Sequence, residues 1–164
     1  MKEIFHRISV RKYEDRPVEP EKIEILLRAA MAAPSARNQQ PWEFFVVTNR
    51  EKLTELSKAT PYCGFTAGAP AAIVTAYRKN CAAPDYAHID MSACMENLLL
   101  AADGQGLGGT WMGIAPIPER MQTVEQILDI PDTLRAFAIY AFGYPAESRP
   151  QEDRYDPARI HWVR

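Results

Sequence analysis

The sequence predicts a single domain, residues 1–164, in which helices surround a central β-sheet covered on both faces. With 164 residues, 47% hydrophobic and 24% charged, the chain has the size and balance of a globular domain with a substantial core. The segment AFAIYAFGY, residues 136–144, is apolar on both faces, which is typical of a central, doubly covered strand. The wide apolar stripe of residues 87–106 indicates a helix buried in the domain or in a subunit interface.

The first half of the chain predicts two helices and two strands. A helix begins at Pro20, because proline suits the first helical turn, and ends before Pro34. Its inward face carries apolar residues at helical spacing: Ile23, Leu26, Leu27, Ala30 and Met31. The run 44–48 is β-branched and aromatic and predicts a short buried strand. A small helix around Leu53 and Leu56 and a strand over residues 71–77 follow.

After the long helix we expect a strand at residues 110–114, a helix at 121–128 and the central strand. The intervening GQGLGG contains the spacing of a dinucleotide-binding loop, but it follows a helix and precedes a strand, which is the reverse order. We therefore interpret these glycines as a helix end and a tight turn.

The last residues, about 146–164, are polar and contain prolines, so they cannot form a core of their own. Ile160, Trp162 and Val163 nevertheless need a surface against which to pack. We expect an arm that wraps either a partner subunit or the chain's own core.

Charge and composition exclude several classes of protein. A formal net charge of −2 argues against a nucleic-acid partner, and no apolar stretch approaches the roughly 20 residues of a membrane span. Three cysteines without CxxC spacing predict reduced thiols and a cytoplasmic protein, and Cys63 is more simply explained as a buried thiol than as a redox group. The scattered histidines predict no metal site.

Two polar clusters suggest a planar, phosphorylated cofactor. In RISVRKY, the forked donors of Arg7 and Arg11 with the hydroxyl of Ser9 could surround a phosphate, since alternate residues of an extended segment face one way. The loop PSARNQQPW, residues 34–42, is rich in amides and stiffened by two prolines. Such a loop suits the recognition of a heteroaromatic ring with several carbonyls and nitrogens.

Six motifs in this order resemble the FMN-dependent nitroreductase family: RxSxRxY, PSxxNxQPW, AP before the second strand, DxxxxxxN in the long helix, GLGGTWMG and a late DRYDPxRIHW. The resemblance covers nearly the whole chain. It implies an α+β fold with a central, mostly antiparallel sheet flanked by helices. It also implies an intertwined homodimer with a C-terminal arm and two FMN sites at the interface, in a short and minimal member of the family.

The resemblance also implies roles for individual residues. The resemblance implies that Arg7, Arg11 and Arg154 bind the phosphate of FMN. Ile8 and Ser9 are also expected to contact FMN. Pro34, Ser35 and Asn38 are expected to contact the flavin from the other subunit. Trp111, Gly113 and Ile114 lie along the flavin ring, with a backbone N–H of Gly113 or its neighbour near N5, although Trp111 could equally be core. Asp90 and Asn97, seven residues apart on one helix face, are read as structural contacts at the dimer interface.

The implied activity is ping-pong hydride transfer from NADH or NADPH to nitroaromatics, quinones or similar planar acceptors, with no catalytic side chain required. Glu152 departs from the pattern, because many relatives carry a cation there and a carboxylate cannot bind phosphate ionically. A non-catalytic FMN carrier or sensor, and a flavin-dependent specialist such as a dehalogenase, are the alternatives.

Overall fold

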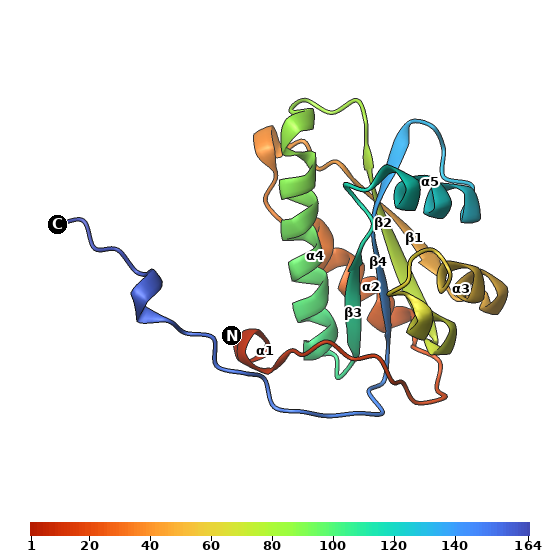
Figure 1. The fold of residues 1–164 in the computed structure, drawn as a ribbon, viewed down its shortest axis with the longest axis horizontal. Helices are drawn as coiled ribbons and strands as arrows, with labels where there is room; N and C mark the ends of the chain where they lie inside the picture. The colour runs from red at the N-terminus through yellow and green to blue at the C-terminus, as the bar shows by residue number, and fades with distance from the viewer.

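The computed structural model describes residues 1–164 and is built on a four-stranded sheet in the order β1-β2-β4-β3 (Figure 1). Every neighbouring pair in this sheet is antiparallel. The strands are β1 (Trp42–Val47), β2 (Ala71–Arg78), β3 (Gly108–Gly113) and β4 (Leu134–Gly143). The helices are α1 (Lys2–His6), α2 (Pro20–Met31), α3 (Arg50–Leu56), α4 (Ala87–Gly104) and α5 (Pro118–Ile127). The expected α+β architecture is confirmed.

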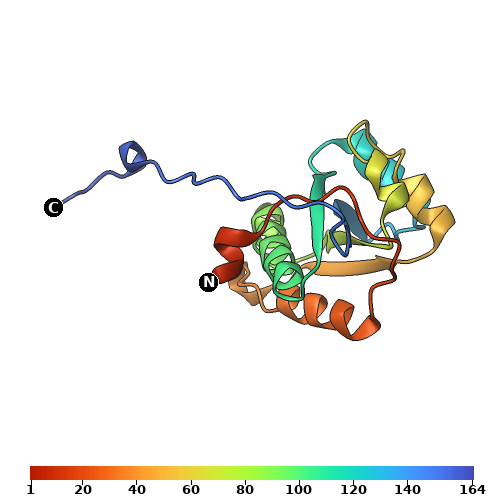
Figure 2. The same ribbon diagram turned by 90° about the horizontal axis from the view of Figure 1, so that it is seen from below.

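Helices cover both faces of the sheet, with α2 and α4 on one side and α3 and α5 on the other (Figures 1 and 2). The core is accordingly divided into clusters of 19 and 16 buried residues. Along β4, Tyr140 and Phe142 belong to the α4 side, whereas Ile139 and Ala141 belong to the α3 side. This alternation explains why the strand is apolar throughout, and it confirms the central position predicted for it.

All the strands and longer helices expected from the sequence are present, with three differences. Strand β1 lies at an edge of the sheet, so its middle is only partly buried and Val46 is 43% exposed. Met31, expected on the inward face of α2, is at the last turn and 51% exposed. Helix α1 was not expected, because five residues give too little periodicity to reveal a helix.

The segment after α1 lies against β3. The Val10 N–H donates to the Gly109 carbonyl at 3.1 Å, and the Thr110 hydroxyl donates to the Val10 carbonyl at 2.8 Å. A Cβ at Gly108 would lie 2.6 Å from a Val10 methyl, so glycine permits this close approach. Gly106, with a φ of +71°, follows the end of α4. The glycine run therefore contains the helix end that was predicted, and it also provides a packing surface that was not.

Residues beyond Pro145 leave the body of the molecule as an extended arm (Figures 1 and 2). Tyr155, Trp162 and Val163 are 72%, 76% and 98% exposed. The arm was expected to wrap either a partner subunit or the chain's own core. The chain's own core does not cover the apolar residues of the arm. None of the helices combines the length and the apolar character that crossing a membrane would require.

Candidate functional site

The second half of β3 is an open sheet edge. Val10 covers the beginning of the strand, where the Gly109 carbonyl points away from β4. Because backbone groups alternate in direction along an antiparallel strand, the N–H groups of Trp111 and Gly113 also point to this outer side. A Cβ at Gly113 would meet only the Ala115 carbonyl, at 3.9 Å, so the space above this residue is open.

A cavity of about 430 Å³ lies beside this open edge. It contains two arginines and several aromatic rings but no carboxylate. Its lining consists of Arg11, Thr60, Tyr62, Phe65, Thr110, Trp111, Met112, Gly113 and Arg120. The Arg11 guanidinium lies 5.7 Å from the centre of the Phe65 ring, and that of Arg120 lies 5.6 Å from the Tyr62 ring. A planar aromatic molecule with an electron-rich edge suits such walls.

A smaller cavity of about 190 Å³ lies where the arm crosses the N-terminal segment. Its lining is Arg7, Ile8, Ser9, Arg149, Pro150, Gln151, Glu152 and Arg154. The Gln151 side-chain amide donates to the Arg7 carbonyl at 2.7 Å and thereby ties the arm to the N-terminal segment. Three guanidiniums and a hydroxyl against one carboxylate leave this cavity positively charged, which suits a phosphate.

The structure brings Arg7, Ser9 and Arg154 together but places Arg11 in the other cavity, with Trp111 and Gly113. This differs from the expectation that Arg7 and Arg11 grip one phosphate. The two arginines are four residues apart in the N-terminal segment, and their side chains line different cavities.

Arg149 is a site residue that the sequence reasoning missed. It lines the 190 Å³ cavity and supplies a third cation there, so the carboxylate of Glu152 is outnumbered. The available signal was its position in the same arm, five residues before Arg154. Glu152 itself is exposed and takes part in none of the ion pairs of the structure.

Ile114 and Cys63 are buried away from these cavities. Ile114 is fully buried in the core on the α3 side, and its N–H donates to the Phe137 carbonyl at 3.1 Å. The Cys63 thiol is also fully buried, 3.0 Å from the Thr60 hydroxyl, and burial raises its pKa. A thiol held protonated in the core is not set up for redox chemistry.

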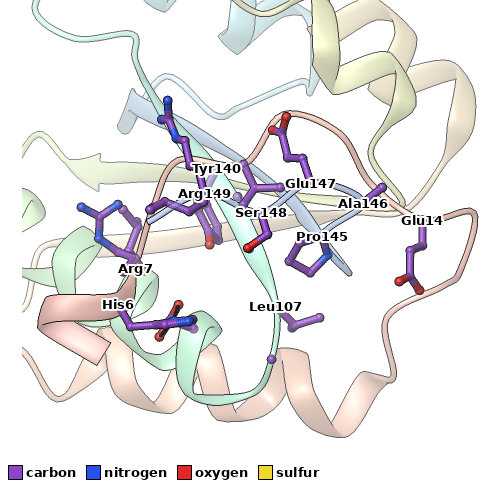
Figure 3. Close-up of a pocket in the computed structure, with 17 residues that line it drawn as sticks. His6, Arg7, Glu14, Leu107, Tyr140, Pro145, Ala146, Glu147, Ser148 and Arg149 are labelled. Atoms are coloured by element: carbon purple, nitrogen blue, oxygen red, sulfur yellow. Dashed lines mark hydrogen bonds and ion pairs between the residues drawn. The ribbon is translucent and has the colours of Figure 1, made fainter. Parts of the chain in front are cut away.

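A further cavity, of about 540 Å³, lies between the N-terminal segment, the end of α4 and the beginning of the arm (Figure 3). Its walls carry charges of both signs. His6 Nδ1 lies 2.8 Å from an Asp103 oxygen, and the Glu147 carboxylate accepts from the Arg11 N–H at 2.7 Å. This backbone hydrogen bond lowers the pKa of Glu147. The pairs tie α1 and the arm to the body beside Arg7, which borders both this cavity and the 190 Å³ one.

The loop that follows α2 is held rigidly by its own hydrogen bonds. The Ser35 hydroxyl accepts from the Gln40 N–H at 3.0 Å, and the Asn38 side-chain oxygen accepts from the Gln40 amide at 2.9 Å. Three residues adopt left-handed backbone angles, namely Arg37, Asn38 and Gln40, with φ of 53°, 53° and 45°. Because non-glycine residues rarely adopt these angles, the surrounding contacts must fix the loop.

Asp90 on α4 is the main anchor of this loop. Its buried carboxylate accepts from the Ala36 N–H at 2.9 Å and from the Gln39 side-chain amide at 2.6 Å. Asn97 donates to the Ala29 carbonyl of α2 at 3.1 Å. Both residues make structural hydrogen bonds within the chain, and their place at a dimer interface stays a prediction.

The loop and the open edge of β3 lie on opposite sides of α4 (Figures 1 and 2). Pro34 and Asn38 are exposed there, and Ser35 is half-buried. One chain therefore does not bring Pro34, Ser35 and Asn38 to the cavities that contain Gly113 and Arg154.

Comparison with known proteins gives a consistent result over the whole chain. The nitroreductase family profile matches residues 4–60 and 56–144. A protein of Archaeoglobus fulgidus, provisionally named NADH dehydrogenase/NAD(P)H nitroreductase, is 40% identical over 98% of this chain and 95% of its own length. An FMN-dependent nitroreductase from Clostridium difficile is 30% identical, with a TM-score of 0.91 over 100% of this chain and 99% of its own.

A third protein, a provisionally assigned nitroreductase from Desulfovibrio desulfuricans, was solved in complex with FMN. It is 27% identical, with a TM-score of 0.81 over 99% of this chain and 95% of its own. Sequence and fold thus agree along the entire length. The chain belongs to the nitroreductase family.

Proposed function

We propose that this protein is an FMN-dependent NAD(P)H oxidoreductase that works as an intertwined homodimer and reduces nitroaromatics, quinones or similar planar acceptors. Family membership and the FMN-dependent relatives support this proposal. The observation that carries it is the open edge of β3, where the outward amide of Gly113 adjoins a cavity with aromatic and cationic walls.

The 190 Å³ cavity fits the phosphate of FMN. Arg7 and Ser9 come from the N-terminal segment, whereas Arg149 and Arg154 come from the arm. A phosphate carries up to two negative charges and several acceptor oxygens, and these three guanidiniums with one hydroxyl can satisfy them. Ile8 closes one wall of the same cavity.

The 430 Å³ cavity fits the flavin ring. Gly113 offers an unpaired N–H with open space beside it, Trp111 forms part of the wall, and Arg11 places a positive charge along it. Ile114 supports this strand end from the core. Bound FMN would supply the redox chemistry, taking a hydride from NADH or NADPH and passing it to the acceptor in ping-pong order. The side chains bind and orient, and none is required as an acid or base.

A second copy of the chain would complete the site. The loop with Pro34, Ser35 and Asn38 is rigid and faces outward, yet lies across α4 from its own chain's cavities. The apolar residues of the arm are exposed and need a partner surface. Exchange of both elements between two subunits accounts for these features together.

Absorption spectra and steady-state kinetics test this proposal. Protein purified with added FMN should show a bound-flavin spectrum and oxidise NADH or NADPH when menadione or a nitrofuran is added. Bound FMN without turnover would support the carrier or sensor alternative, and failure to bind FMN at micromolar concentration would contradict both.

The division between the two cavities gives a sharper prediction. Arg7→Gln should weaken FMN about tenfold but leave riboflavin, which lacks the phosphate, unchanged. Arg11→Gln should weaken FMN and riboflavin by similar factors, because it faces the ring cavity. Fluorescence titration measures the affinities for both flavins. If Arg11→Gln loses the preference for FMN over riboflavin, Arg11 contacts the phosphate and not the ring.

A further inference from the structure

The cavity beside Gly113 contains an arginine that the proposed function does not use. Arg120, near the beginning of α5, lies over the Tyr62 ring and takes part in none of the ion pairs of the structure. Arg135, which also packs against α5, is instead paired with Glu125 at 2.8 Å. Arg120 is therefore a half-buried cation without a counter-charge.

The surroundings of Arg120 favour an anion. None of the residues that line the cavity is acidic, and Arg11 adds a second positive charge. Concave walls of low polarity strengthen the field of such charges and concentrate anions between them. The centre of the Tyr62 ring lies 5.6 Å from the guanidinium carbon, and the N–H groups of the guanidinium can still donate to an anion in the cavity.

We propose that Arg120 selects electron acceptors that carry a carboxylate on a planar aromatic ring. This inference rests on the proposed function, because the acceptor must enter the cavity beside Gly113. A carboxylate attached to the acceptor ring stays within that cavity. The phosphates of NADH and NADPH are separated from the nicotinamide by a ribose, so the acceptor is the molecule whose charge reaches Arg120.

Direct binding tests the proposal without turnover. Benzoate and benzamide have the same shape but differ in charge, and calorimetric titration of the FMN-loaded protein should show tighter binding of benzoate. Arg120→Gln should weaken benzoate about tenfold and change benzamide less than twofold, because it removes charge-assisted hydrogen bonds. Arg120→Lys, which keeps the charge but loses the fork, should retain part of the preference.

A matched control separates a local contact from a change in net charge. Lys58 is exposed, forms none of the ion pairs and does not line the cavity, so Lys58→Gln removes one positive charge elsewhere on the same side of the sheet. It should leave both affinities unchanged. Equal affinities of the wild type for benzoate and benzamide, or equal effects of Lys58→Gln and Arg120→Gln, would overturn the proposal. Unchanged FMN content and unfolding temperature identify variants that are folded.

Kinetics extend the test to acceptors. Arg120→Gln should lower kcat/KM for 4-nitrobenzoate about tenfold and leave that for methyl 4-nitrobenzoate unchanged. With menadione as the neutral acceptor, Arg120→Gln could instead lower kcat/KM for NADPH more than for NADH. That result would mean that Arg120 binds the dinucleotide, and it would overturn the proposal. If the wild type reduces neither the ester nor menadione, the proposed function fails. The benzoate titration of the FMN-loaded protein needs no turnover and still decides the role of Arg120.

Discussion

In the proposed homodimer, the loop at residues 34–40 and the exposed end of the arm at residues 146–164 both contact the neighbouring subunit, yet they are built in opposite ways. The loop is fixed inside its own chain by the Asp90 carboxylate and by internal hydrogen bonds. The arm is tied to the body only at its beginning, by Glu147 and Gln151, and then exposes Trp162 and its other apolar residues.

This difference determines when each element loses its conformational freedom. The loop is ordered during folding of the single chain, so it presents Ser35 and Asn38 without a further entropic cost on binding. The arm has no core of its own, so its order and its arginines depend on the surface that it covers. Cofactor binding should therefore be coupled to dimerisation through the arm and much less through the loop.

Truncation of the arm should have the largest effect. Removal of residues 146–164 deletes Arg149 and Arg154 from the 190 Å³ cavity, together with all the exposed apolar residues of the arm. We expect a monomer with FMN affinity reduced at least about 100-fold, because two charge-assisted contacts are lost together. Light scattering and flavin titration measure both quantities. A truncated protein that remains dimeric and retains FMN would show that the arm is dispensable.

Asp90→Ala should have the next largest effect on FMN affinity, and it should act through the loop alone. The change leaves the Ala36 N–H and the Gln39 amide without their buried acceptor, which should lower the free energy of unfolding by about 2–4 kcal/mol. FMN affinity should fall because the left-handed residues of the loop lose their support, while the protein remains a dimer. Urea unfolding and flavin titration provide the measurements.

Asn97 offers the matched control for that prediction. It lies on the same helix and donates one neutral hydrogen bond, to the Ala29 carbonyl. Asn97→Ala should lower the free energy of unfolding by about 1 kcal/mol and leave FMN affinity unchanged. An equal loss of FMN in the two variants would mean that Asp90 acts through general stability and not through the loop.

Periodicity was sufficient to predict the strands and the longer helices. The run 136–144 is apolar on both faces because it lies between two helical layers, and the stripe of α4 packs into one of them. Periodicity could not place Met31 or Val46, because the exposure of an apolar residue at a helix end or a sheet edge depends on what lies across from it.

The candidate site was predictable by residue but not by arrangement. The alternation of Arg7, Ser9 and Arg11 suggested that they converge on one phosphate, but pattern alone does not say that Arg7 and Ser9 line one cavity and Arg11 another. Arg149 and Arg120 were not predicted as site residues, for a similar reason. Each is brought to its cavity by the path of the arm or of α5, which a local motif does not encode.

Glu152→Gln should have the smallest effect on FMN affinity, and it should raise the affinity where the other changes lower it. This exposed carboxylate lines the 190 Å³ cavity with Arg7, Arg149 and Arg154, so it would repel a phosphate that these arginines attract. Its removal should tighten FMN about two- to fivefold, which is modest because solvent screens exposed charges, and the gain should shrink as salt is raised. Riboflavin affinity should not change. Glu51→Gln makes the same change at an exposed carboxylate of α3 that lines none of these cavities, and it serves as the control. Weaker FMN binding in Glu152→Gln would mean that this carboxylate orders the arm, so that even the charge opposing the cofactor helps to hold the arm in place.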